Sequence, residues 1–254
     1  MSARPTPKRR QRGGAAATAG RGDGPVGPSD APAPAEAPVA GLAASQLRRL
    51  RRIVDAAVSL ADQGGFEGVR LRDVAEASDV ALGTLYKYFR NKEDILLFAL
   101  SEQVGQLEAA LVRAPVEGGS PLERVVAFFA RSTAGLTRRP QFARAVLRSM
   151  ASGDPEIAVK IAAFHLRMTR LIVAAMRGEI PALEEPVMAE VGSERERQVA
   201  FILMNVWYSS LAGWAGGLHP PKVVEDHIRT AAALMSVLST IHPAPRSAGA
   251  AEAR

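Results

Sequence analysis

A short run of small, hydroxyl-bearing and basic side chains near position 85 has the chemistry that contact with DNA requires. Glycine allows a helix to approach the floor of a major groove closely, while hydroxyls and an ammonium group can bond to base edges or phosphates. A helical hairpin of no special purpose rarely combines these residue types at one helix start. The residues predicted to contact DNA here are Leu82, Gly83, Thr84, Tyr86, Lys87 and Tyr88.

Two short helices joined by a tight turn would hold this run in place. Val74 fits the inner face of a first helix, and Leu85 and Phe89, four residues apart, fit the inner face of a second. Asp79 falls where the chain must turn sharply, and aspartate tolerates the left-handed backbone conformation better than bulky residues do. Residues 70–91 therefore predict a helix-turn-helix.

Basic residues around this unit predict contacts with the DNA backbone. A helix that begins at Ser45 and stops at Gly64-Gly65 carries four arginines near its beginning. Beside a helix-turn-helix, such arginines favour binding to phosphates over a merely solvated face. Lys92, at the N-terminus of the next helix, predicts a further phosphate site. The predicted backbone contacts are Arg49, Arg52, Arg72 and Lys92.

The stretch from Leu82 to Leu96, Leu-Gly-Thr-Leu-Tyr-Lys-Tyr-Phe-Arg-Asn-Lys-Glu-Asp-Ile-Leu, resembles the signature of the TetR family of repressors. The resemblance covers about residues 53–100. It implies that the N-terminal helices bind DNA and that the rest of the chain dimerises and binds a small-molecule inducer. Two positions depart from the family pattern: Ala81 stands where a hydroxyl residue usually caps the recognition helix, and Asp79 stands where the turn usually has glycine.

Composition limits the other classes of function. The 254-residue chain has no cysteine, which excludes disulfides and thiolate metal sites. Its net charge of +6 is uneven, because residues 1–52 hold 10 Lys or Arg against 3 acids, a net of +7 that leaves −1 for the remainder. Residues 1–44 have almost no large apolar side chains, so we expect a disordered basic tail. Such a tail attracts phosphates non-specifically or has no role, and no apolar export segment follows it.

Helix starts recur along the rest of the chain without strand-like alternation, which predicts an all-α fold. Asn91, Ser120 and Ser193 each stand three residues before an acid, the pattern of a helix N-cap. An N-terminal three-helix helix-turn-helix DNA-binding head is thus expected before a C-terminal helical domain for ligand binding and dimerisation. The predicted boundaries are 1–44 for the tail, 45–100 for the head, 101–242 for the C-terminal domain and 243–254 for a second disordered tail.

The segment 199–218 contains 20 residues without a charge. A transmembrane helix is one interpretation, supported by Gly213 and Gly217 at GxxxG spacing, but Asn205 and the glycine pair at 216–217 weigh against it. A soluble helix that faces a pocket on one side and a second subunit on the other is favoured. This segment and the last helix resemble the dimer-forming pair of the TetR family. The predicted dimer interface consists of Leu211, Trp214, Ile228 and Met235.

A ligand pocket is expected among the C-terminal helices, lined by apolar and flexible side chains with few polar anchors. Arg144 and Arg148 supply the cations that an acidic head, such as that of an acyl-CoA, would need. The stretch Asn205 to Trp214 is similar to that of actinobacterial repressors of sterol catabolism, which implies a sterol-derived inducer as another choice. The predicted pocket residues are Phe128, Phe129, Arg144, Leu147, Arg148, Met150, Met168, Asn205 and Trp207.

Catalytic chemistry finds no support in the sequence. The four histidines show no spacing with acids that would indicate a metal site, and no phosphate loop or nucleophile elbow is present. We therefore expect no enzyme and no cofactor. The predicted protein is a cytoplasmic homodimeric repressor that binds a palindromic double-stranded DNA operator, is released by a hydrophobic inducer and has no membrane association. A nucleoid-type protein without sequence preference and a membrane-associated interaction protein are the alternatives.

Overall fold

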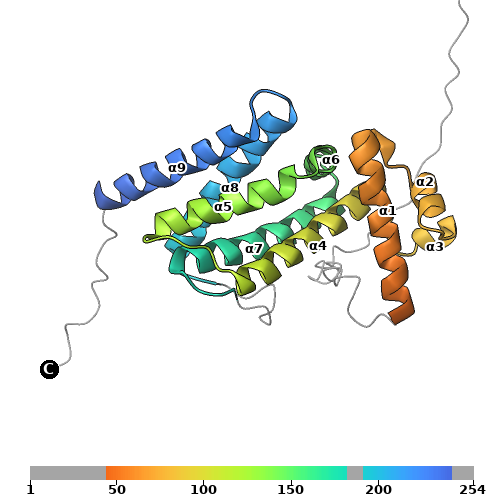
Figure 1. The fold of residues 1–254 in the computed structure, drawn as a ribbon, viewed down its shortest axis with the longest axis horizontal. Helices are drawn as coiled ribbons and strands as arrows, with labels where there is room; N and C mark the ends of the chain where they lie inside the picture. The colour runs from red at the N-terminus through yellow and green to blue at the C-terminus, as the bar shows by residue number, and fades with distance from the viewer. Residues whose placement is uncertain (1–43, 182–190, 242–254) are drawn as a thin grey trace, which may run out of the picture. The chain divides into compact units, whose positions relative to one another are not determined.

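The computed structural model describes residues 44–181 and 191–241, and all regular secondary structure within them is helical (Figure 1). The predicted all-α fold is confirmed. The predicted tails and the centre of the loop before Ser193 lie outside the described residues. The helices are α1 (Ala44–Gly68), α2 (Leu71–Ala77), α3 (Leu82–Leu85), α4 (Lys92–Arg113), α5 (Pro121–Thr137), α6 (Pro140–Met150), α7 (Pro155–Arg177), α8 (Glu194–Ala215) and α9 (Pro221–Ile241).

The first helix, α1, supports the helix-turn-helix. Its apolar stripe, which includes Leu50, Ile53 and Ala57, is buried, and the helix packs against α2, α4 and α6. Figure 1 shows α2 and α3 on the side of α1 that faces away from α5, α8 and α9. Gly65 adopts φ 59° and ψ −154°, which breaks the helix where the glycine pair predicts a stop. Helical turns resume after Gly65 and continue to Gly68.

The turn between α2 and α3 has the predicted geometry. Asp79 has a φ of 52° and is the one residue other than glycine with a positive φ among those described. Ala81 precedes α3 without a side-chain cap, as the sequence indicates. The α-helical part of α3 is short, and hydrogen-bonded turns continue it, with Phe89 N donating to Leu85 O at 3.0 Å. We call residues 82–89 the recognition segment.

Three of the later helices begin at the residues that the sequence predicts as N-caps. The side chain of Asn91 accepts from Asp94 N at 2.8 Å, and that of Ser120 accepts from Glu123 N at 3.2 Å. Ser193 starts α8 with a complete capping box. These bonds satisfy backbone donors that have no partner inside the helix, which explains why each helix starts there.

The fourth helix, α4, leaves the head and enters the C-terminal bundle. It packs against α1 in the head and against α6 and α7 in the bundle. By length and apolar composition, α4 is the one described helix that could cross a membrane, whereas α8 is not. Ile95, Leu96 and Leu100 on α4 are buried in this fold, so packing accounts for its apolar character.

The C-terminal bundle is completed by packing of α5 with α7 and α9 and of α8 with α9. Phe128, Phe129 and Phe142 are almost fully buried at its centre. The rings of Phe129 and Trp207 lie with their centroids 5.6 Å apart. One face of the uncharged segment therefore lies in the core of the bundle, and the helix that contains it ends at Ala215, just before the glycine pair.

One ion pair connects the end of α7 to the start of α8. Arg177 donates to both carboxylate oxygens of Glu196 at 2.8 Å each, and Ser193 N donates to the same carboxylate at 2.7 Å. The Arg177 guanidinium, helped by the bonds from Ser193, lowers the pKa of Glu196 from 4.5 to about 2. The folded state therefore favours the ionised carboxylate.

We expect Glu196→Gln to destabilise the protein by about 1 kcal/mol at pH 7, because the cap and the ion pair are both weakened. Since the pKa of Glu196 is lower in the folded state, its stabilisation is complete above about pH 4.5 and declines as the pH falls toward 2. Thermal unfolding of wild type and variant between pH 7 and pH 3 should show the difference shrinking. Glu194→Gln is the matched control, and a pH-independent difference would contradict the prediction.

Candidate DNA-reading surface and ligand cavity

The recognition segment presents small and polar side chains on its open face. Tyr86 is 52% exposed, Gly83 and Lys87 are exposed, and open space surrounds the α-carbon of Gly83. Leu85 and Phe89 lie beneath this face and are buried, as predicted. The structure therefore brings the predicted DNA-contacting groups together. The remaining members of the set, Leu82, Thr84 and Tyr88, are half-buried.

An ion pair between a basic and an acidic side chain lies beside this surface. The Arg52 guanidinium lies 3.5 Å from the Asp79 carboxylate, which is almost fully exposed. One predicted phosphate-binding arginine is thus partly neutralised by the residue that replaces the turn glycine. Arg72 is exposed and Arg49 is half-buried. Their contacts with DNA stay predictions.

Lys92, predicted to bind a phosphate, has several partners within the chain, and its contact with DNA stays a prediction. Its ammonium donates to Phe66 O at 3.0 Å, lies 3.7 Å from the centre of the Phe66 ring and lies 3.5 Å from the Glu67 carboxylate. The N-terminus of α4 also holds the buried carboxylate of Asp94, which accepts from Arg90 N at 3.1 Å. Both the lysine and the helix terminus are therefore occupied by groups of the chain itself.

Arg148, predicted to pair with a ligand, is held in the same cluster. Its guanidinium lies 4.5 Å from the centre of the Phe66 ring and 2.8 Å from the Glu67 carboxylate. The side chain therefore connects α6 to the end of α1. Sequence spacing could not reveal this, because Phe66 and Arg148 are far apart in the chain.

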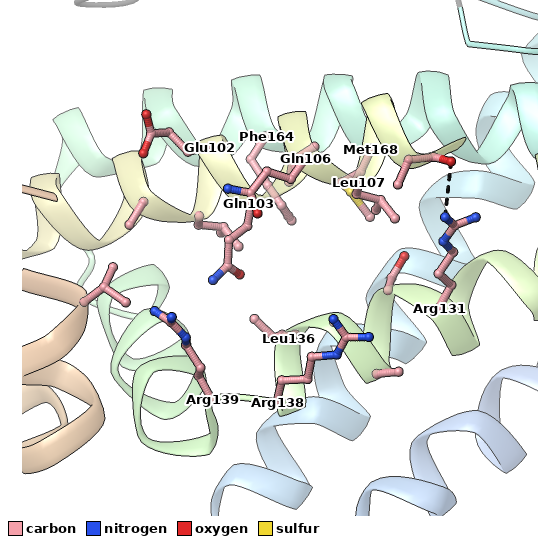
Figure 2. A pocket seen from close by; sticks show the side chains of 18 of the residues that line it. Glu102, Gln103, Gln106, Leu107, Arg131, Leu136, Arg138, Arg139, Phe164 and Met168 are labelled. Carbon is pink, nitrogen blue, oxygen red and sulfur yellow. Dashed lines mark hydrogen bonds between the residues drawn. The ribbon is translucent and has the colours of Figure 1, made fainter. Parts of the chain in front are cut away.

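A cavity of about 670 Å³ lies among α1, α4, α5, α7 and α8. This volume is in the range of sites for drug-sized molecules. Figure 2 shows Gln103 pointing into the opening from α4, with Arg138 and Arg139 on the opposite side. The apolar part of the lining includes Val58, Leu100, Leu107, Leu136, Phe164, Met168 and Trp207. The polar part includes Asp55, Glu102, Gln103, Gln106, Arg131, Ser132, Arg138 and Arg139.

The arginines of the cavity differ in what they already bind. Arg131 donates to Ala114 O at 2.6 Å and to Ala110 O at 3.2 Å, so it caps the carboxyl end of α4. Arg139 lies 3.6 Å from the Asp62 carboxylate. Arg138 is exposed at the rim. An anion entering the cavity would therefore meet Arg138 first and Arg139 with it.

These two arginines were absent from the set predicted from the sequence. The one available signal was the run Arg138-Arg139 directly before Pro140, which marks a short connection between two helices. On the other side of the opening, burial raises the pKa of the Glu102 carboxyl. The cavity thus combines cations, amides and a carboxyl whose pKa is raised by burial.

Only two of the predicted ligand-binding residues line the cavity, namely Met168 and Trp207. The indole N–H of Trp207 donates to Thr133 Oγ1 at 2.8 Å inside the core. Phe128, Phe129 and Leu147 are core residues outside the cavity, and Met150 is half-buried outside it.

Two further predicted pocket residues lie outside the lining of the cavity. Asn205 is exposed and donates to Phe201 O at 2.8 Å. Arg144 donates to Ala215 O at 3.1 Å and lies over the Trp214 ring. Its guanidinium is therefore bonded to the carboxyl end of α8.

The predicted dimer residues are mostly core residues. Leu211 and Ile228 are each 1% exposed and Trp214 is 6% exposed, so none of the three offers a free surface. Met235 is half-buried. Among the side chains that the structure describes, the large apolar ones that α8 and α9 expose are Phe201, Ile202 and Leu234. Helical periodicity identified apolar positions but not which neighbour covers them.

Within residues 44–181 and 191–241, no group of three His, Asp or Glu side chains could hold a metal ion. His165 lies beside Phe164, with ring centroids 5.8 Å apart. Burial lowers the pKa of His165, so it favours the neutral form.

Both the head and the C-terminal part of the chain match families of known proteins. Residues 53–98 match the family described as bacterial regulatory proteins, tetR family, and residues 118–235 match the tetracyclin repressor-like C-terminal domain. The HTH-type transcriptional repressor KstR of Rhodococcus jostii is 33% identical over 170 residues, which cover 67% of this chain and 74% of that protein. KstR of Mycobacterium tuberculosis is 31% identical over 191 residues, 73% and 82% of the two chains.

Solved structures show the same fold. A TetR transcriptional regulator from Rhodococcus sp. RHA1 superposes with a TM-score of 0.64 at 23% identity, covering 76% of this chain and 98% of that one. The FadR repressor of Thermus thermophilus, solved in complex with lauroyl-CoA, gives a TM-score of 0.57 at 22% identity over 79% and 99% of the two chains. With both halves matched and the KstR relatives aligned over most of their length, this chain belongs to the TetR family of bacterial regulatory proteins.

Proposed function

We propose that this protein is a cytoplasmic, ligand-responsive transcriptional repressor. Residues 45–100 form its DNA-binding head, and residues 101–242 form the part that binds ligand and dimerises. As a homodimer it binds a pseudo-palindromic operator whose half-sites lie about 34–36 Å apart, one helical turn of DNA. The names of the KstR relatives support repression.

The cavity of about 670 Å³ is the observation that carries the ligand response. Its lining combines apolar side chains such as Phe164 and Met168 with the cationic rim of Arg138 and Arg139. An amphiphile with an apolar body and a phosphate or carboxylate head fits both properties. Lauroyl-CoA, the ligand named for the Thermus thermophilus relative, has this chemistry, and so does a CoA thioester of a sterol side chain.

Release from DNA requires that the ligand bind one conformer of the dimer better than another. The cavity shares α4 with the head. Gln103 and Leu107 of this helix line the cavity, while the ring of Phe98, nearer its start, lies 5.6 Å from that of Phe89 in the recognition segment. A ligand that prefers the conformer with wrongly spaced heads by a factor of about 100 supplies roughly 2.7 kcal/mol. Tight binding without such a preference would leave the DNA affinity unchanged.

The proposed dimer surface is the exposed apolar face of α8 and α9. Phe201, Ile202 and Leu234 are 59%, 48% and 60% exposed, an uncommon amount of apolar area for a solvated helix pair. A second copy would cover this face by a symmetric contact. This choice replaces the predicted interface at Leu211 and Trp214.

Selection of duplexes from a random pool, followed by gel shifts with lauroyl-CoA, tests the proposal as a whole. A palindromic consensus and release by the thioester are expected. Binding to every duplex alike would favour a nucleoid-type protein. Partition with lipid vesicles and no DNA binding would favour the membrane-associated alternative.

We expect Lys87→Ala and Tyr86→Ala each to weaken operator binding about tenfold, because each removes a polar contact to the groove or its phosphates. Gel-shift titration at fixed salt measures the change. Lys222→Ala removes the same charge from α9 and is the matched control. Unchanged operator affinity in a folded Lys87→Ala protein would contradict the assignment of this face.

We expect the double variant Arg138→Gln/Arg139→Gln to bind lauroyl-CoA about tenfold or more weakly, because charge-assisted bonds to the head are lost. Isothermal titration measures the affinity. Arg195→Gln, on the exposed start of α8, is the control for general charge effects. If wild type, the double variant and Arg195→Gln bind the thioester with equal affinity, the anionic head of the ligand does not contact Arg138 or Arg139.

We expect Phe201→Glu to raise the dimer dissociation constant at least about tenfold, because a charge would be buried without a partner. Sedimentation velocity over a dilution series measures the change. Leu166→Glu places the same charge on an exposed apolar position of α7 and should leave the dimer intact.

We expect Trp214→Ala, by contrast, to lower the free energy of unfolding by about 3–5 kcal/mol, because that ring is buried in the subunit.

A further inference from the structure

Two pairs of opposite charges connect the end of the recognition segment to α7. Arg90 and Asp94 are four residues apart at the start of α4, and Glu156 and Lys160 are four residues apart in the first two turns of α7. Arg90 pairs with Glu156, and the Lys160 ammonium donates to Asp94 Oδ1 at 2.6 Å. We call these four residues the charge ladder.

The inner pair of the charge ladder has one buried member. Asp94 is 4% exposed, and its second oxygen accepts from Arg90 N at 3.1 Å. The Lys160 side chain is 38% exposed, but its removal would leave the buried Asp94 carboxylate without its closest cation. Arg90 directly follows Phe89, the buried last residue of the recognition segment. The place where this segment ends therefore depends on a carboxylate that α7 holds.

The outer pair has a different character. The side chains of Arg90 and Glu156 are 61% and 54% exposed. Exposed ion pairs contribute little to folding stability, so this pair can change without unfolding the chain. It does restrict the direction in which the head can tilt against α7. The inner pair thus holds the start of α4 against α7, and the outer pair restricts the angle between the head and α7.

The same helix reaches the ligand cavity. Lys160 precedes Phe164 by one helical turn and Met168 by two, and both of these side chains line the cavity. A continuous helix transmits a small displacement along its axis, so a ligand that moves Phe164 also moves Lys160 and Glu156. The head also contacts the bundle through α6, which packs against α1 and α4, and polar contacts such as Arg148 with Glu67 and Arg139 with Asp62 lie on that side.

We propose that the charge ladder is the connection through which the ligand-binding bundle positions the recognition segment. In this role Glu156 and Lys160 act through Arg90 and Asp94 and contact neither DNA nor ligand. The inference rests on the proposed function, since a positioned segment matters only if it reads an operator. It adds to that function the specific residues that carry the coupling.

A charge-swap cycle tests the outer pair. We compare wild type, Arg90→Glu, Glu156→Arg and the double variant Arg90→Glu/Glu156→Arg. The first readout is the ratio of affinities for a selected operator duplex and a random duplex of equal length, which cancels the direct effect of a changed charge near phosphates. The second readout is hydrogen exchange of the amides in residues 86–91 in the protein without DNA.

Each single variant is expected to lose about tenfold in the affinity ratio and to exchange these amides about tenfold faster, because like charges then face each other across the junction. The double variant should return to within about threefold of wild type in both readouts. Glu194→Arg, the same charge change on α8, should match wild type. Thermal midpoints confirm that every protein is folded.

The proposal is overturned if Glu156→Arg behaves like Glu194→Arg, or if the double variant is as defective as Arg90→Glu alone. If wild type shows no preference for any duplex, the proposed function fails instead. The exchange readout then still decides whether the charge ladder holds the recognition segment. The two failures are thus distinguishable.

Discussion

The first half of α4 has to be covered from two sides, and this requirement determines how the rest of the chain is arranged. Ile95 and Leu96 are fully buried, and helices of both the head and the bundle pack against α4. α1 covers them from the head, and α6 and α7 cover them from the bundle. Since protein interiors are close-packed, a change in the spacing of α6 and α7 must either shift α4 or open a void.

Features that depend on local chemistry were predictable from the sequence. The left-handed turn at Asp79, the inward side chains of Leu85 and Phe89, and the helix starts at Asn91 and Ser193 all follow from a few neighbouring residues. Each involves backbone conformation or hydrogen bonds within one turn, where residue type restricts the choices strongly. The all-α class follows from the same local rules added along the chain.

Features that depend on which distant surfaces meet were not predictable in this way. Apolar spacing identified Trp214 and Ile228 as inward positions but could not tell a subunit core from a subunit interface. Arg148 and Lys92 have the charge for an anion, yet both contact Phe66 and Glu67, which only the folded chain brings near them. The family resemblance supplied the correct architecture, while the positions of the cavity residues required the three-dimensional arrangement.

The hydrogen bond between Trp207 and Thr133 has a consequence for selectivity. Trp207 lines the cavity, but its only polar hydrogen is already bonded at 2.8 Å within the core, so its lining surface is purely apolar. A hydroxyl or keto group placed against that surface would give up its bonds to water and gain none, a penalty of about 1–3 kcal/mol. This part of the lining therefore favours a hydrocarbon segment of a bound molecule, and a hydroxyl or keto group would have to lie against the polar side of the cavity, near Gln103 and Gln106.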